Sequence, residues 1–216
     1  MPSNVDIAKR IAKILLSPET AVGLINGILS VPTDIGYLAF GFIDTDSRRL
    51  RETDKIRMVS AIRYGILENQ NIKNTIETVL RLFNKDVPEE KQNAMYSKTT
   101  AAIAGRTLTN SIISSKLAAI ITQRSTVFIK IKGGLIGNVL LAGGMAERSV
   151  YTSERLQLNS PEVYSALRPQ NYDLLYFLAE PVLNPFVEAL NVKRNQGKPA
   201  FDQIINMVES EINAKK

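Results

Sequence analysis

Ser115 and Lys116 form the arrangement in this sequence closest to a covalent nucleophile, because a lysine can activate a nearby serine. Adjacent residues on a helix point in different directions, however, so this pair cannot readily interact. The 216 residues include no histidine and no cysteine, which removes the usual general base, the thiol nucleophile and the thiolate zinc ligands. We therefore predict no catalytic residues, no metal site and no cofactor, and we favour a non-catalytic protein over an enzyme.

A glycine cluster lies where a phosphate-binding loop would lie. Residues 126–132 alternate between apolar and polar side chains, which is typical of a strand. Gly133, Gly134 and Gly137 follow at the start of a predicted helix. The cluster lacks the Gly-Lys-Ser/Thr ending of a nucleotide loop and the glycine spacing of a dinucleotide site. We interpret these glycines as positions of tight turning and close helix packing.

Nucleic acid binding is suggested by the net charge of +6 and by a cluster of basic residues at 48–63. Acidic residues are interspersed among them, and pairs such as Arg48 with Glu52 have the spacing of salt bridges on a helix. No aromatic residues alternate with the basic ones to stack on bases. A solvated, salt-bridged helix face explains this region better, so we do not expect a nucleic acid partner.

Two stretches of the chain are almost without charge. Residues 20–43 contain one charged side chain, Asp34, and residues 133–146 contain none but include five glycines. Such stretches must be buried in a close-packed interior or transferred to a membrane or a partner. The first is long enough to cross a hydrocarbon layer of about 30 Å. Pro32 would break such a helix, and Asp34 would cost roughly 3 kcal/mol on insertion.

The leading hypothesis is a membrane-active, pore-forming-like effector or toxin that is soluble until its apolar, glycine-containing hairpins insert into a bilayer. Basic side chains would contact lipid head groups, and the glycines would let inserted helices pack closely. A toxin of this type implies a protective protein as partner. The residues assigned to head-group contact are Lys9, Arg10, Lys13, Lys130 and Lys132, and those assigned to membrane insertion or helix packing are Gly23, Gly27, Asp34, Gly133, Gly134, Gly137, Gly143 and Gly144.

The alternative hypothesis is a cytosolic all-α module for protein binding or oligomerisation, without catalytic activity. Its rows of small residues would form grooves that receive a partner helix or a second copy of the chain. Basic residues near the N-terminus precede an apolar run, but Ser17-Pro18-Glu19 interrupts it and no cleavage site of small residues follows. We therefore expect synthesis in the cytoplasm without a cleaved signal peptide, followed in the leading hypothesis by action at a membrane.

The elements that position these residues are predicted to be mainly α-helices, in a multi-helix globular bundle with at most a small β ribbon near 126–132. Ser3 is a candidate helix cap, and the apolar residues after it lie on one helical face. Residues 18–43 are predicted to form an apolar helical hairpin or a kinked helix. Apolar residues recur at helical spacing through 56–66 and 72–83, which predicts an antiparallel helix pair.

The last third of the chain differs from the rest in its proline content. Five of the nine prolines lie after residue 160, so short helices are predicted there. The helix that follows Gly134 is expected to end near Arg148. We therefore predict a helical body with apolar hairpin segments at 1–150 and a C-terminal short-helix region at 151–216, packed on the same core.

Overall fold

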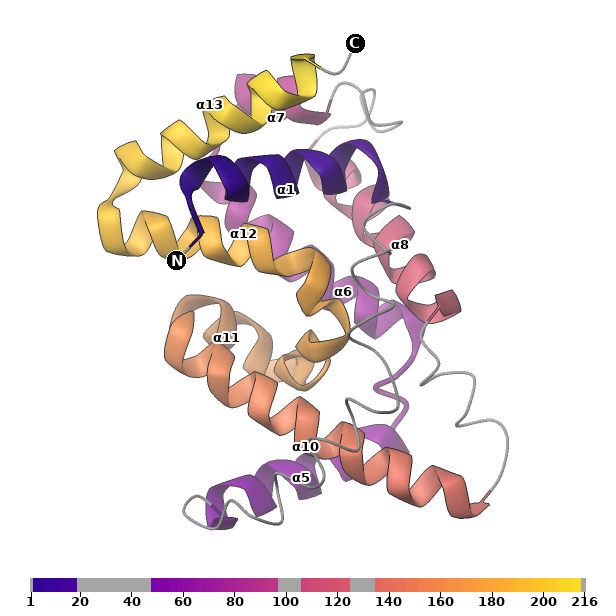
Figure 1. Cartoon of the computed structure of the whole chain (residues 1–216). Coiled ribbons are helices and arrows are strands. Elements are labelled where there is room, and N and C mark those ends of the chain that lie inside the picture. Colours follow the sequence, from indigo (N-terminus) through magenta and orange to yellow (C-terminus); the bar gives the residue numbers. More distant parts are fainter. Residues whose placement is uncertain (1, 19–47, 97–105, 125–134, 215–216) are drawn as a thin grey trace.

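The computed structural model describes residues 2–18, 48–96, 106–124 and 135–214. These residues form nine α-helices and two 3-10 helices, with no strand among them, which confirms the predicted mainly α bundle (Figure 1). The predicted ribbon at 126–132 and residues 19–43 of the predicted hairpin lie outside the described residues. The elements are α1 (Asn4–Leu16), α5 (Arg48–Arg63), α6 (Asn69–Lys85), α7 (Glu89–Tyr96), α8 (Arg106–Arg124), α10 (Leu135–Asn159), α11 (Pro161–Leu167), η1 (Arg168–Gln170), η2 (Tyr172–Leu174), α12 (Tyr176–Gln196) and α13 (Lys198–Ala214).

Helix α1 begins where the sequence predicts. Ser3 Oγ accepts a hydrogen bond from the Asp6 backbone N–H, and the Asp6 carboxylate accepts one from the Ser3 N–H, which together form a capping box. The apolar face of α1 is buried, including Ile7, Ile11 and Leu15. This face packs against α13 and α12, so α1 is fixed to the C-terminal helices (Figure 1).

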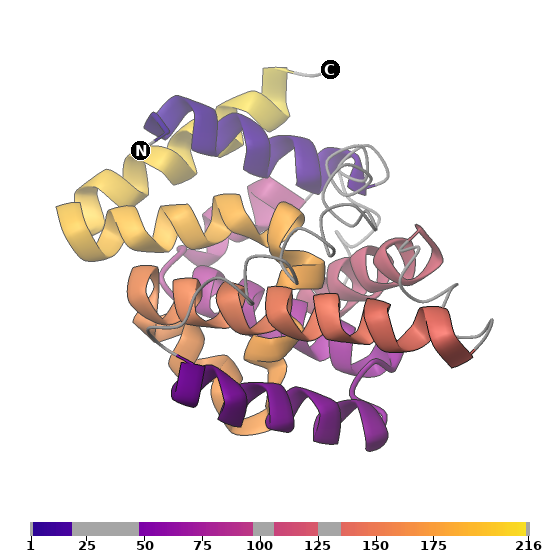
Figure 2. The same cartoon turned by 60° about the horizontal axis from the view of Figure 1, so that its bottom comes forward.

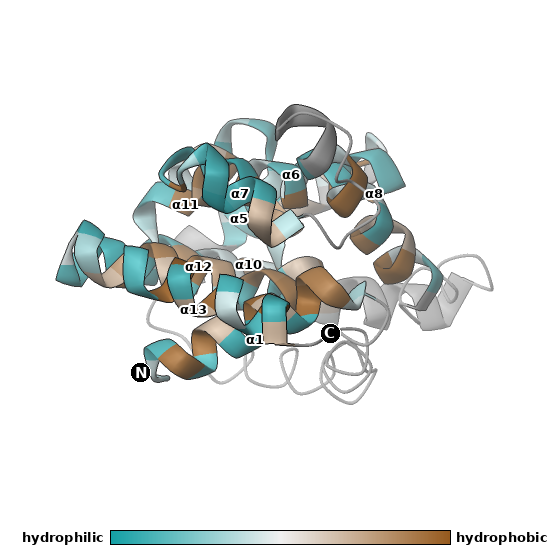
Figure 3. Ribbon diagram, turned by 90° about the horizontal axis from the view of Figure 1, so that it is seen from above, coloured by the Kyte–Doolittle hydropathy of each residue, from teal (hydrophilic) through white to brown (hydrophobic). Residues whose placement is uncertain are grey.

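The centre of the apolar core joins α6, α12 and α13. The ring of Phe83 on α6 meets Phe186 on α12 at 5.1 Å and Phe201 on α13 at 5.5 Å, both edge to face. All three rings are completely buried, and edge-to-face pairs add to the free energy that burial itself provides. Hydrophobic residues of α1, α12 and α13 gather where these helices meet (Figure 3).

The two helices predicted at 56–66 and 72–83 form, but they do not pack as the predicted antiparallel pair. Helix α6 packs mainly against α8 and α12, whereas α5 lies along α10 at the edge of the molecule (Figure 2). Among the described side chains of α5, the buried ones are Met58 and Ala61. The buried face of α6 is instead covered by α8 and α12.

The prediction of short helices after residue 160 is wrong for α12, which has 21 residues. Helix α12 contains Pro181 and Pro185 in its interior. Each proline removes one backbone hydrogen bond, but the buried apolar face of α12 compensates for this loss. Gly197 then ends α12 with a φ of 86°, a conformation that favours glycine.

Helix α10 also runs further than predicted, to Asn159 rather than to Arg148. No proline or glycine interrupts residues 145–159, and Ser160-Pro161 provides the first strong break. The continuation brings the second half of α10 alongside α12 and α11. The predicted division at residue 150 falls inside this helix and stays a prediction.

Candidate binding cleft

Most residues predicted to act at a membrane lie outside the part of the chain that the structure describes. Among the others, Lys9 and Lys13 are exposed on α1, while Arg10 forms an ion pair with Glu188 on α12. Gly144 is buried within α10. Gly137 and Gly143 lie in the same helix, in a part whose side chains are not described, and those outside the description altogether are Gly23, Gly27, Asp34, Lys130, Lys132, Gly133 and Gly134.

In the described ranges, no helix is both long enough and apolar enough to cross a membrane. Helix α10 is long enough, at 25 residues, but its second half contains charged and hydroxyl side chains. Groups of histidine, cysteine, aspartate or glutamate that could bind a metal ion are also absent from the described ranges. The structure instead directs attention to a cleft that the sequence did not predict.

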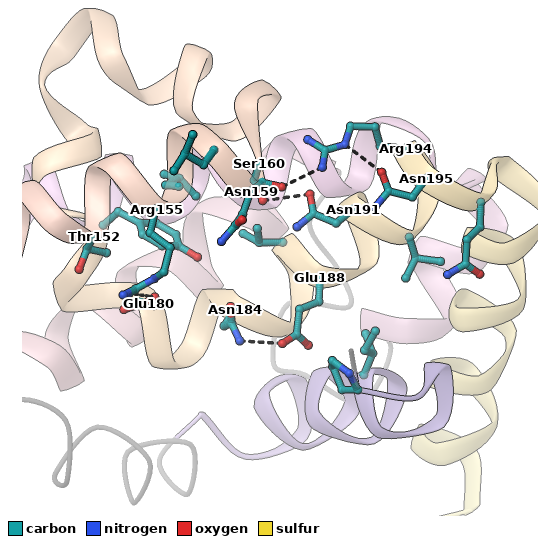
Figure 4. Close-up of a pocket in the computed structure, with 18 of the residues that line it drawn as sticks. Thr152, Arg155, Asn159, Ser160, Glu180, Asn184, Glu188, Asn191, Arg194 and Asn195 are labelled. Carbon is teal, nitrogen blue, oxygen red and sulfur yellow. Dashed lines mark hydrogen bonds and ion pairs between the residues drawn. The ribbon is translucent and has the colours of Figure 1, made fainter.

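This cleft lies between α1, α10 and α12 and has a volume of about 420 Å³ (Figure 4). That volume is within the range of ligand sites, roughly 300–1,000 Å³. Apolar side chains contribute to its walls, among them Ile7, Leu156 and Val187. Leu158 on α10 also lines the cleft, although 79% of its surface is exposed. The cleft therefore combines an apolar lining with an exposed apolar contact at its edge.

One wall of the cleft is a polar row on α12. Its residues recur at intervals of four, four, three and four, which places them on a single helical face. The opposite side of α12 carries Phe186 into the core, so the helix serves the core with one face and the cleft with another. The polar row consists of Glu180, Asn184, Glu188, Asn191 and Asn195.

Ion pairs connect the polar row to both neighbouring helices. Arg155 on α10 contacts Glu180 at 2.5 Å, and Arg10 on α1 contacts Glu188 (Figure 4 shows the first pair). Asn184 donates from Nδ2 to Glu188 Oε1 at 2.8 Å. Glu188 is therefore held by two groups, Arg10 and Asn184, and Glu180 by Arg155.

The asparagines of the row leave complementary groups for a ligand. Asn191 Oδ1 accepts from Ser160 Oγ at 2.9 Å, and Asn195 Oδ1 accepts from Arg194 (Figure 4). Within the described part of the chain, the amide nitrogens of these two residues remain as donors, whereas Asn184 keeps its carbonyl oxygen as an acceptor. The row therefore offers an acceptor at Asn184 and donors at Asn191 and Asn195, the two kinds of group that a peptide backbone also presents.

Two hydroxyl groups at the cleft lack protein partners. Thr152 on α10 is buried, and its Oγ1 makes no hydrogen bond to any described residue. Tyr176 at the start of α12 is also buried, and no hydrogen bond joins its hydroxyl to the described residues. Burial raises the pKa of Tyr176, and the nearby carboxylates of Glu180 and Glu188 raise it further, so the hydroxyl stays protonated. Buried polar groups without partners are costly, which points to a ligand or water at this position.

A second polar region, the α5–α10 junction, lies next to the cleft. Asp173 in η2 is fully buried and accepts hydrogen bonds from Arg57 at 2.5 Å, Ser153 at 2.6 Å and Arg168 at 3.3 Å. Burial raises the pKa of Asp173 to about 6, while Ser153 and Arg168 oppose the shift and the charge of Asp54 adds to it. The structure therefore holds a carboxyl group that changes charge near neutral pH.

The junction leaves several buried groups unsatisfied. Lys55 on α5 pairs with Glu147 on α10, yet Glu147 Oε2 has no hydrogen-bond partner among the described residues. Arg57 Nη1 and Asp173 Oδ1 also lack a hydrogen-bond partner among the described residues. Arg148 is buried as well, with its guanidinium 5.4 Å from the centre of the Phe177 ring. This region stabilises the fold less than its number of charges suggests.

The cleft was detectable in part from the sequence. The spacing of residues 180–195 places five polar side chains on one helical face, and this pattern was obscured by the prediction of short helices after residue 160. The predicted helix end near Arg148 likewise separated Thr152 and Arg155 from the helix that positions them. Which hydroxyls lack partners depends on three-dimensional packing alone.

The comparisons with known proteins found no match, neither to a protein family nor to a curated protein or a solved structure. The chemistry of the cleft must therefore be judged from its own residues. The lining has carboxamide, carboxylate, guanidinium and hydroxyl groups but no histidine or cysteine, because the chain contains neither. Such a lining can form hydrogen bonds and ion pairs, and it suits recognition better than covalent catalysis.

Proposed function

We propose that this protein is a non-catalytic binding module whose cleft between α1, α10 and α12 holds an extended segment of another polypeptide. The observation that carries the proposal is the buried hydroxyl of Thr152, which lines the cleft and makes no hydrogen bond to any described residue. A ligand that supplies a hydrogen bond to this group removes a cost that the unbound protein bears.

The composition of the polar row favours a polypeptide as the ligand. A carboxamide has one acceptor oxygen and one donor nitrogen, which are the same groups that a peptide bond presents. Asn184, Asn191 and Asn195 present these groups in a row along α12. Exposed Leu158 offers a contact for an apolar side chain of the partner. An extended segment carries both kinds of group, since its backbone is polar and its side chains include apolar ones.

The proposal is tested by selecting peptides of twelve residues from a random library on the full-length protein and measuring their affinity by fluorescence anisotropy. Leu158→Asp should weaken the selected peptides at least tenfold, because it removes an apolar contact and adds an unpaired charge at the cleft. Val5→Asp is the matched control, since Val5 is an exposed apolar residue of α1 outside the cleft. Failure to select any peptide, or equal affinity for Leu158→Asp, would overturn the proposal.

A membrane-active function is the second candidate, and we infer it from a different observation. The stretch 20–43 carries one charge over 24 residues, and it follows an α1 helix on which Lys9 and Lys13 are exposed. Exposed basic residues beside an apolar stretch favour contact with anionic head groups. Its test is release of dye from anionic liposomes, which Gly133→Leu with Gly137→Leu should reduce. Absence of leakage at every lipid composition and pH would eliminate this candidate.

A further inference from the structure

The charges of the cleft are arranged by depth. In the pair between α10 and α12, Glu180 is 23% exposed and Arg155 is 44% exposed. In the pair between α1 and α12, Glu188 is 21% exposed and Arg10 is 34% exposed. In both cases the carboxylate lies deeper than the arginine. The carboxylate is therefore the more buried member of each pair, although the cleft lining also includes Arg155 and Arg194.

Both carboxylates face the same cleft. Glu180 and Glu188 both line it, and their spacing along α12 places them on one face of the helix. Tyr176 belongs to the same lining, and burial and the charges of Glu180 and Glu188 raise the pKa of its hydroxyl, while the charge of Arg155 lowers it. The two glutamates therefore face a common space rather than separate parts of the surface. A positive group that enters this space interacts favourably with both.

The arginines that now pair with these glutamates are replaceable. Partly exposed ion pairs contribute little to stability, because water and salt screen them. When a partner's lysine takes the place of Arg155 or Arg10, the arginine moves into solvent and the carboxylate keeps a positive neighbour. The exchange leaves no buried charge unpaired, so replacement of the arginine by the partner's lysine costs little free energy.

The distance between the glutamates sets the spacing of the partner's charges. Glu188 lies eight positions after Glu180, and a helix rises about 12 Å over that interval. An extended chain advances about 3.3 Å per residue, and alternate side chains point to the same face. Residues four positions apart therefore share a face and lie about 13 Å apart, which matches the separation of the two carboxylates.

We propose that the cleft recognises an extended polypeptide segment with two basic side chains four residues apart, one placed at Glu180 and the other at Glu188. This inference rests on the proposed binding function and specifies its partner. The asparagines between and beyond the glutamates bind the backbone of the segment, and the two charges fix its register. The net positive charge of the protein slows the approach of such a partner, but charges more than about 8–10 Å away are screened at physiological salt.

The experiment uses fluorescein-labelled peptides of nine residues with the full-length protein at physiological salt. One peptide carries lysines at positions 3 and 7, a second carries them at positions 3 and 6, and a third has serine at both. The peptide with matched spacing should bind about tenfold more tightly than the other two, since only it places both lysines at carboxylates. Equal affinity of the two lysine peptides would overturn the inference.

Variants then assign the effect to the two glutamates. Glu180→Gln and Glu188→Gln should each lower the affinity of the matched peptide about tenfold and abolish the preference for spacing. Glu162→Gln is the matched control, because Glu162 is exposed on α11 and lies outside the cleft, and it should leave binding unchanged. Unchanged binding by both cleft variants would contradict the inference.

Two further outcomes separate this inference from the proposed function. If lysine-free peptides selected from the library bind and lose affinity in Leu158→Asp, the binding function stands and the basic spacing is wrong. If no peptide binds in a manner that depends on the cleft, both are wrong. Spermine serves as a competitor, and displacement by spermine at the same concentration as the matched peptide would identify a polyamine site instead of a polypeptide site.

Discussion

The core around Phe83 and the α5–α10 junction differ in whether their buried polar groups have hydrogen-bond partners. Beside Phe83, the buried side chain of Asn84 has both polar atoms paired, with Asn110 at 2.6 Å and with Tyr96 at 2.9 Å. At the junction, Glu147 and Asp173 are buried with one carboxylate oxygen each lacking a hydrogen-bond partner in the described chain. The core is apolar and satisfied, whereas the junction is charged and only partly satisfied.

This difference indicates which parts of the molecule define the fold and which are available for function. Apolar packing with satisfied polar groups stabilises one structure. Unsatisfied buried groups cost stability, so they persist where something other than stability retains them. Helix α10 contributes to both the cleft and the junction. Thr152 on this helix lines the cleft, and its hydroxyl is one of the buried groups that lack a hydrogen-bond partner among the described residues.

The largest expected effect is in the core. Phe83→Ala removes a fully buried ring that contacts two other rings, so the free energy of unfolding should fall by about 3–5 kcal/mol. Urea denaturation measures this change. Leu158→Ala, at an exposed position, is the control and should change stability by less than about 0.5 kcal/mol. A loss below about 1 kcal/mol for Phe83→Ala would show that these rings are not the centre of the fold.

A somewhat smaller effect is expected from the titration of Asp173. Its pKa is raised from 3.8 to about 6 in the folded protein, so its contribution to stability is fully present below pH 3.8 and is lost as the pH rises through 6. The Asp173→Asn variant has no ionisable group at position 173. The stability of the wild type relative to this variant should therefore fall by about 2 kcal/mol between pH 4 and pH 7.

Denaturation of both proteins across this pH range isolates Asp173, because the other carboxylates titrate in both and cancel in the difference. The opposite slope, with the wild type losing relative stability on acidification, would mean that Arg57 and Arg168 outweigh burial and keep the pKa low. The junction would then be a stabilising salt-bridge network, and its contrast with the core would disappear.

The smallest effect concerns the pair of Lys55 and Glu147. Replacement of both by apolar residues of similar size, as Lys55→Met with Glu147→Leu, should change the free energy of unfolding by no more than about 1 kcal/mol. Glu147 is 7% exposed at its side chain and has an unsatisfied oxygen, so the pair brings little net stabilisation. A loss of more than about 3 kcal/mol in urea denaturation would show that this ion pair anchors α5.

The sequence was sufficient to predict the helical class and several helix boundaries. Ser3 was identified as the cap of α1, because this signal depends on neighbouring residues only. The pairing of helices was not predicted. Residues 56–66 have helical spacing, but the partner of α5 is determined by how much apolar surface other helices offer, which local periodicity does not contain.

The candidate cleft was missed for a related reason. The predictions placed function in the glycine-rich, uncharged stretches, most of which lie outside the described residues, and treated residues 151–216 as a region of short helices. Helix α12 tolerates Pro181 and Pro185 because tertiary burial offsets the lost backbone hydrogen bonds. Only the continuous helix brings Glu180, Asn184 and Glu188 onto one face.

The most direct test of the account is the double variant Thr152→Val with Tyr176→Phe, which removes only the two unpartnered hydroxyls of the cleft. Its free energy of unfolding should equal or exceed that of the wild type, because no protein hydrogen bond is lost. Its affinity for the selected peptides should fall about tenfold. Reduced stability with unchanged peptide affinity would contradict the account, since the hydroxyls would then serve the fold and not a ligand.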